Sequence, residues 1–163
     1  MATKLEGLLW RPTWNSAFGC LKGCLDYLGA DLSLPWLFGA TGHAFAINIH
    51  KELCPSGPTA WDWEGGVFGL GHNLGYHISS LETGDFWHEL RSRPGYEAKV
   101  KSAWAFARGN LDVGLPVFWW AFKIPEYYVI YGWDEGGLYY SGPHAEGGGG
   151  PEPWQGLDSV GVF

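Results

Sequence analysis

The hydrophobic period of the chain changes near residue 110, and this change constrains the fold more than any other feature. Before it, residues 16–28 and 96–110 carry apolar side chains at helical spacing. After it come short aromatic and β-branched runs typical of strands, at residues 116–122, 127–131 and 137–141. Helices followed by antiparallel strands predict an α+β fold, with a helical first half packed on a sheet from the second half.

The helix predicted at residues 16–28 has recognisable signals at both ends. Asn15 or Ser16 can cap its start, and Gly29 stands where a left-handed residue commonly ends a helix. Cys20 and Cys24 fall on its apolar stripe, where they read as small buried hydrophobes. The full stripe consists of Ala17, Cys20, Leu21, Cys24, Leu25 and Leu28.

The second helix, at residues 96–110, is expected to end at Gly109 or Gly114. Its predicted buried stripe consists of Val100, Ala103, Trp104, Ala107 and Leu111. Predictions follow for three other segments. Residues 41–49 are expected to form a helix or a strand, residues 147–150 a surface loop, and residues 159–163 a further strand.

Composition sets the class of protein. With 163 residues, 46% of them apolar and 17% charged, the chain suits a single domain over residues 1–163 and is not disordered. A net charge of −7 without a basic stripe argues against nucleic acid as a partner. The apolar runs are too short to span a membrane, and the first residues lack a signal-peptide pattern, so we expect a cytoplasmic protein. The odd cysteine count, Cys20, Cys24 and Cys54, indicates reduced thiols.

Aromatic residues make up 17% of the chain, and 26 glycines accompany them. Large rings beside glycine are suited to packing against backbone, which predicts a rigid aromatic core. The alternative is that some of the rings line an apolar ligand pocket.

Two segments resemble a known family. The sequence NSAFGCLKGCLDYLG at residues 15–29 resembles the nucleophile helix of bacterial papain-like proteins, in the branch of bacteriocin-leader peptidases and the amino-terminal domain of the butirosin-biosynthesis acyltransferase. In the second half, GLPV at residues 114–117 and EYYVIYGWD at residues 126–134 are similar to that family's strands. The resemblance implies a papain-like fold.

Aligned in this way, the family's three catalytic positions hold other residues. Ser16 stands in the place of the cysteine, Glu126 in that of the histidine, and Gly142 in that of the aspartate. The Pro125–Glu126 pair resembles uncharacterised bacterial members of the same branch. A helix amino terminus alone does not ionise a serine hydroxyl, and a carboxylate is a weak base toward an alcohol. The resemblance therefore implies a pseudoenzyme rather than a peptidase.

Several alternatives stay open at this point. The predicted function is binding of a small molecule or peptide at the vestigial cleft, by residues Trp14, Asn15, Ser16, Trp36, His43, Trp120, Glu126 and Tyr128. One alternative is an enzyme of acyl or amide transfer, or a hydrolytic enzyme, that uses Ser16, or Cys20 or Cys54 relocated against His43. Another is an interaction domain of a larger protein, and a third is that Glu126 only holds the helix start through a structural hydrogen bond. A homodimer is compatible with each.

No cofactor or metal is expected. His72 and His77 are five residues apart, which matches neither the helical spacing of zinc ligands nor a finger pattern.

Overall fold

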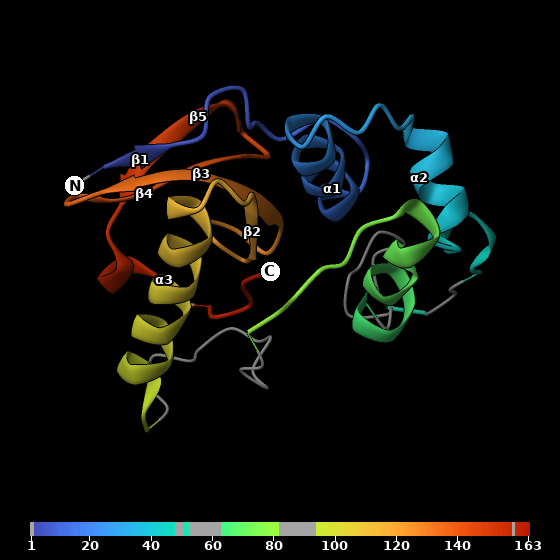
Figure 1. The fold of residues 1–163 in the computed structure, drawn as a ribbon. Helices are drawn as coiled ribbons and strands as arrows, with labels where there is room; N and C mark the ends of the chain where they lie inside the picture. Colours follow the sequence, from blue (N-terminus) through green and yellow to red (C-terminus); the bar gives the residue numbers. More distant parts are fainter. Residues whose placement is uncertain (1, 48–50, 53–62, 82–93, 158) are drawn as a thin grey trace. The chain divides into compact units, whose positions relative to one another are not determined.

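In the computed structural model, β3 (Tyr127–Asp134) is the central strand of an antiparallel sheet (Figure 1). The structure describes residues 2–47, 51–52, 63–81, 94–157 and 159–163. They form two compact units, one of Met1–Ala30 with Ser80–Phe163 and the other of Asp31–Ser79. The single domain expected from the sequence stays a prediction.

The sheet of the first unit has five strands within the described residues. One edge of β3 pairs with β4, which pairs in turn with β5. The other edge of β3 is shared: β2 pairs with its first half and β1 with its last residues. The remaining strands are β1 (Thr3–Lys4), β2 (Val117–Trp120), β4 (Gly137–Gly142) and β5 (Ala145–Glu152).

Two helices of this unit pack on the sheet, which confirms the α+β class. Helix α1 (Ser16–Tyr27) contacts β3 and β4, and α3 (Tyr96–Asp112) contacts β1, β2 and β3. Gly29 (φ 82°) and Gly114 (φ 81°) follow the two helices in the left-handed region, where a side chain is disfavoured. The predicted stripe of α3 is buried except for Trp104, which is partly exposed.

The carboxyl terminus extends this core beyond the free edge of β2. Phe118 and Phe163 exchange two backbone hydrogen bonds of 3.0 and 2.9 Å, and Trp119 forms a bridge with Val162. The strand predicted at residues 159–163 is therefore reduced to a single bridge. Val160, Val162 and Phe163 are buried, so the last residues belong to the apolar core.

The prediction for the glycine run was wrong. The glycine run at residues 147–150 is not a surface loop but part of strand β5. Glycine is usually unfavourable in strands, yet here aromatic rings from β3 and β4 lie over the bare backbone. A Cβ atom added to Gly148 would be 2.8 Å from the hydroxyl oxygen of Tyr131, and one on Gly149 would be 2.9 Å from the ring of Tyr140. The missing side chains make room for these rings.

The second unit is helical in its described part. It contains α2 (Leu34–Ala40), a 3-10 turn (His43–Phe45), a short π-helical segment (Trp63–Phe68) and a 3-10 segment (Gly69–Leu74). Of the helix or strand expected at residues 41–49, the described residues 41–47 form neither an α-helix nor a strand: Gly42 adopts φ 74° and leads into one 3-10 turn. Residues 48 and 49 of that segment lie outside the described part.

Candidate functional site

Asn15 caps the start of α1 and is one of the two residues predicted to do so. The Asn15 side chain accepts hydrogen bonds from the backbone N–H groups of Ala17 (3.1 Å) and Phe18 (3.4 Å). This cap makes Ser16 the first helical residue. The indole Nε1–H of Trp10 donates to the Ser16 carbonyl at 3.1 Å, so the first turn is held from outside the helix as well.

Ser16 and Glu126 are in direct contact, although 110 residues separate them in the sequence. The Ser16 hydroxyl donates a short hydrogen bond to Oε2 of Glu126. It also accepts a bond of 3.0 Å from the backbone N–H of Tyr127. Ser16 is only 8% exposed, whereas Glu126 is half-buried. The structure thus contains the hydrogen bond that is expected if Glu126 holds the start of the helix.

The connection between β2 and β3 presents this carboxylate. Ala121 donates its backbone N–H to the Glu126 carbonyl at 2.9 Å, and Glu126 donates its own to Ile124 at 2.6 Å. Within the described residues, the Glu126 carboxylate forms no ion pair. Among the described residues, the carboxylate is therefore hydrogen-bonded by the Ser16 hydroxyl and not paired with a cation.

The space beside Gly142, the position that the resemblance aligns with the family's aspartate, is filled by an aromatic ring. A Cβ atom on Gly142 would be 2.3 Å from Cδ1 of Tyr128. The hydroxyl of Tyr128 continues past this point and donates to the Pro143 carbonyl at 3.1 Å. Burial, followed by the nearby groups Glu126, Tyr140 and Cys20, raises the pKa of Tyr128 to about 12, so the phenol stays protonated at neutral pH.

Cys20 lies one helical turn after Ser16 and is fully buried. Burial, with smaller contributions from Cys24 and Glu126, raises the pKa of the Cys20 thiol well above its usual value. A nucleophilic thiolate requires the opposite environment. These observations argue against Cys20 as a relocated nucleophile. Cys54, the other candidate, lies outside the described residues.

The aromatic candidates divide by exposure. Trp120 (6% exposed) and Tyr128 (2%) belong to the core of the sheet, while Trp14 is 63% exposed, two residues before Ser16. Trp36 and His43 belong to the second unit. There Trp36 is exposed on α2, and the buried His43 packs against Phe38 with ring centroids 5.6 Å apart. Burial lowers the pKa of His43.

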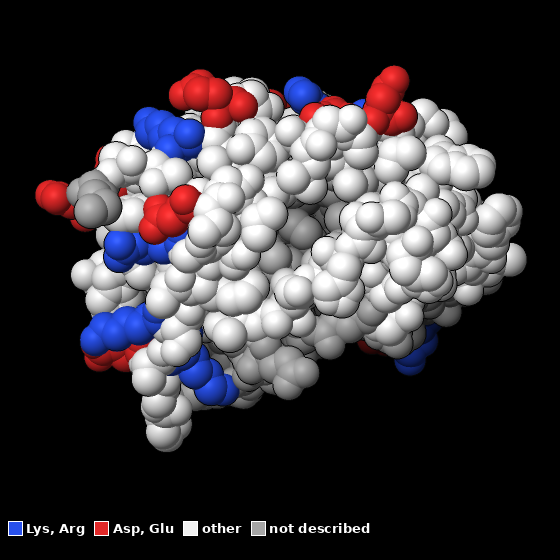
Figure 2. Space-filling view, viewed as in Figure 1, with Lys and Arg blue, Asp and Glu red and all other residues white. Residues whose placement is uncertain are grey.

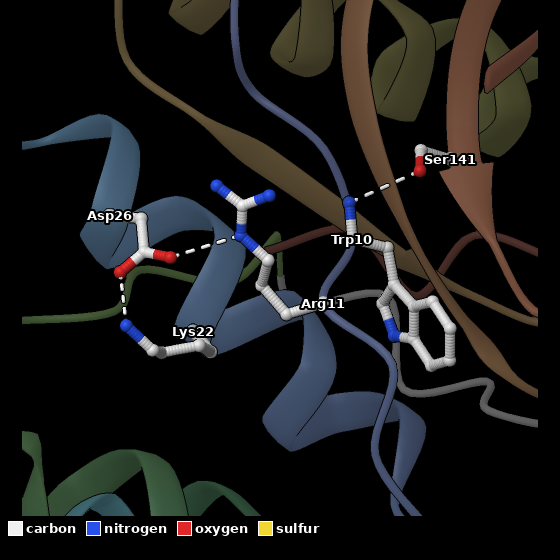
Figure 3. A network of polar contacts seen from close by, with 5 residues as sticks. All are labelled: Trp10, Arg11, Lys22, Asp26 and Ser141. Atoms are coloured by element: carbon white, nitrogen blue, oxygen red, sulfur yellow. Dashed lines mark hydrogen bonds and ion pairs between the residues drawn. The ribbon is translucent and has the colours of Figure 1, made fainter. Parts of the chain in front are cut away.

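Sequence reasoning missed the contacts that hold the amino-terminal segment against α1 and β4 (Figure 3). The backbone N–H of Trp10 donates to Oγ of the buried Ser141 at 3.1 Å. Arg11 contacts Asp26 at 3.0 Å, and Lys22 approaches the other oxygen of the same carboxylate. Burial opposes ionisation of Asp26, but the hydrogen bonds from Lys22 and Arg11 lower its pKa. No sequence motif marks these residues.

The charged surface and the potential metal ligands do not extend the site. On the face shown in Figure 2, basic and acidic side chains are interspersed and form no basic stripe. Across the described ranges, no three His, Cys, Asp or Glu residues are grouped to hold a metal ion. Nor does any helix in those ranges combine the length and the apolar character needed to cross a membrane.

Comparisons with protein-family models, with curated proteins and with solved structures returned no match.

Proposed function

We propose that this chain is a catalytically degraded papain-like domain that binds a small molecule or peptide beside the start of α1. The observation that carries the proposal is the double engagement of the Ser16 hydroxyl. It donates to Glu126 and accepts from the Tyr127 N–H. A nucleophilic serine must instead give its proton to a strong base such as an imidazole.

The ring of Tyr128 gives independent support. In a triad the third residue orients the base, but here the ring fills the space above Gly142. Any side chain at position 142 would displace it. The Tyr128 ring therefore leaves no room at position 142 for a side chain that could orient a catalytic base.

Glu126 and Trp14 indicate the chemistry that such a site favours. A half-buried carboxylate without an ion pair attracts hydrogen-bond donors and positive charge. An exposed indole offers a flat apolar surface that also attracts cations. We therefore expect the ligand to present a polar hydrogen or a cationic group to Glu126, with an apolar part against Trp14.

A titration tests the proposal. The probes are the N-acetyl amides of alanine, lysine and arginine, followed through the Trp14 indole resonance by heteronuclear NMR. At least one probe is expected to shift that resonance, with roughly tenfold weaker binding to Glu126→Gln. Glu97→Gln, which changes an exposed carboxylate on α3, serves as the matched control. Equal binding to the Glu126→Gln variant and the unaltered protein would remove Glu126 from the site.

A further inference from the structure

The connection between β2 and β3 carries two opposite charges, Lys123 and Glu126, that do not pair with each other. Within the described residues, the Lys123 ammonium donates to Oε2 of Glu152 on β5 at 2.6 Å, whereas Glu126 forms no ion pair. Lys123 is the only basic residue of this connection, residues 121–126. Opposite charges so close in the chain attract one another, so their separation needs a cause.

The connection is short enough for the two side chains to meet. Glu126 follows Lys123 by three residues, so their Cα atoms are at most about 11 Å apart even in an extended chain. The chain is folded back here: the Ala121 N–H donates to the Glu126 carbonyl at 2.9 Å, and the Glu126 N–H donates to the Ile124 carbonyl at 2.6 Å. The lysine side chain is long and flexible. Other contacts, and not distance, therefore keep Lys123 from Glu126.

Two contacts turn Lys123 toward β4 and β5. One is the ion pair with Glu152, in which the two side chains are only 37% and 22% exposed. The other is the ring of Tyr140 on β4, which attracts a cation and whose centroid lies 5.7 Å from the Lys123 ammonium. Glu126 instead accepts the Ser16 hydroxyl at the start of α1. The two charges are thus held by different elements.

The basic side chains beside α1 are engaged in a similar way. Arg11 and Lys22 both contact the carboxylate of Asp26, near the end of the helix (Figure 3). In the described part of the chain, these two cations and that of Lys123 each have a carboxylate partner other than Glu126. The Glu126 carboxylate is therefore available to a cation that the chain does not supply.

We propose that Glu152 is a positioning residue of this site: by holding Lys123, it keeps Glu126 available for a ligand that carries a guanidinium or ammonium group. A lysine paired with Glu126 would compete with such a group for the same carboxylate oxygens, and would affect a neutral ligand less. The inference rests on the function proposed above, and it narrows the ligand to a cationic small molecule or peptide.

The test compares a cationic and a neutral probe that share one backbone. N-acetylarginine amide and N-acetylalanine amide are each titrated into the full chain, with the Trp14 indole resonance recorded by NMR. The arginine probe is expected to bind about fivefold more tightly than the alanine probe, which is the upper range for a partly exposed ion pair.

Glu152→Gln releases Lys123 and is expected to weaken arginine binding about fivefold, while alanine binding changes by no more than about twofold. When Glu152→Gln is combined with Lys123→Met, the released cation is gone and the preference for arginine is expected to return. Glu97→Gln is the matched control. Its partner Lys101 likewise has a carboxylate, at 2.7 Å, and an aromatic ring, with the centroid of Trp154 at 5.2 Å. This variant should bind both probes like the unaltered chain.

A purely structural ion pair gives a different pattern. If Glu152 only joins the connection to β5, Glu152→Gln weakens both probes alike and the added Lys123→Met restores neither. That pattern would overturn the inference, as would an unchanged preference in Glu152→Gln or equal binding of the two probes by the unaltered chain.

A Glu126→Gln arm separates this failure from that of the proposed function. If arginine binding falls in Glu126→Gln while Glu152→Gln keeps its preference, only the role of Glu152 is refuted. Equal arginine binding by Glu126→Gln and the unaltered chain, or no binding of either probe, refutes the site itself.

Discussion

The ring of Tyr128 lies where a side chain at position 142 would begin, because a Cβ atom on Gly142 would be 2.3 Å from Cδ1 of that ring. The two residues come from adjacent strands of the same sheet, β3 and β4. Glycine at this position is therefore a packing requirement. The absence of a carboxylate there follows from how the core is filled.

Gly142→Ala is accordingly expected to destabilise the fold by about 1–3 kcal/mol, the usual cost of overpacking a core. Urea unfolding measures the change. Gly147→Ala is the matched control, since a Cβ atom there meets nothing within 4 Å, and its effect should stay within about 0.5 kcal/mol. Equal effects of the two substitutions would show that the Tyr128 ring does not occupy this space.

Ser16→Ala tests the structural weight of the Ser16–Glu126 contact. The substitution leaves the backbone N–H of Tyr127 without its acceptor, and an unsatisfied buried donor costs about 1–3 kcal/mol. Ser102→Ala, at an exposed serine on α3, should change the free energy of unfolding by no more than about 0.5 kcal/mol. A neutral Ser16→Ala would contradict the hydrogen-bonded arrangement described here.

The helix cap provides a third prediction. Asn15→Ala removes the acceptor for the N–H groups of Ala17 and Phe18 and should destabilise the protein by about 1 kcal/mol. Asn15→Asp retains the acceptor and should lose much less stability. Thermal unfolding of both variants distinguishes a true cap from a merely buried side chain, for which the two substitutions would cost alike.

The buried thiols predict how the free energy of unfolding changes with pH. Burial raises the pKa of Cys24 from its ordinary value of 9.0 to about 12, and that of Cys20 is also raised. A raised pKa means that the native state holds the proton more tightly than the unfolded state. The contribution to stability is therefore complete below pH 9 and is lost as the pH rises from 9 toward 12.

Urea unfolding between pH 8 and pH 10.5 should show this decline, with a slope of up to about 1.4 kcal/mol per pH unit for each thiol above pH 9. Cys24→Ala removes one of the two groups and should make the slope shallower.

In a Cys54→Ser background, the native protein should also resist a thiol reagent at pH 8 and react only when unfolded. Rapid labelling of Cys20 would show that this thiol is accessible.

The two helices and the central strands could be predicted from the sequence because each carries a regular apolar period. Residues 16–28 and 96–110 differ from the observed helices by one or two positions at their ends. The contact between Ser16 and Glu126 was anticipated through the family resemblance, which aligned both positions.

The remaining elements carry no recognisable pattern in the sequence. Strand β5 was missed because its glycines are strand breakers when considered singly, and only the rings of Tyr131 and Tyr140 make them suitable. Strand β1 has two residues, too few for any period. The positive φ of His144 (64°) depends on the turn that follows β4 and could not be inferred from composition.

The proposed function requires Ser16 to be a hydrogen-bonded residue rather than a nucleophile. Incubation of the full chain with a fluorophosphonate, followed by mass spectrometry of the intact protein and of its peptides, tests this directly. We predict that Ser16 remains unmodified, at the level found for Ser102. Stoichiometric phosphonylation of Ser16, abolished in Ser16→Ala, would contradict the account and establish a serine enzyme in its place.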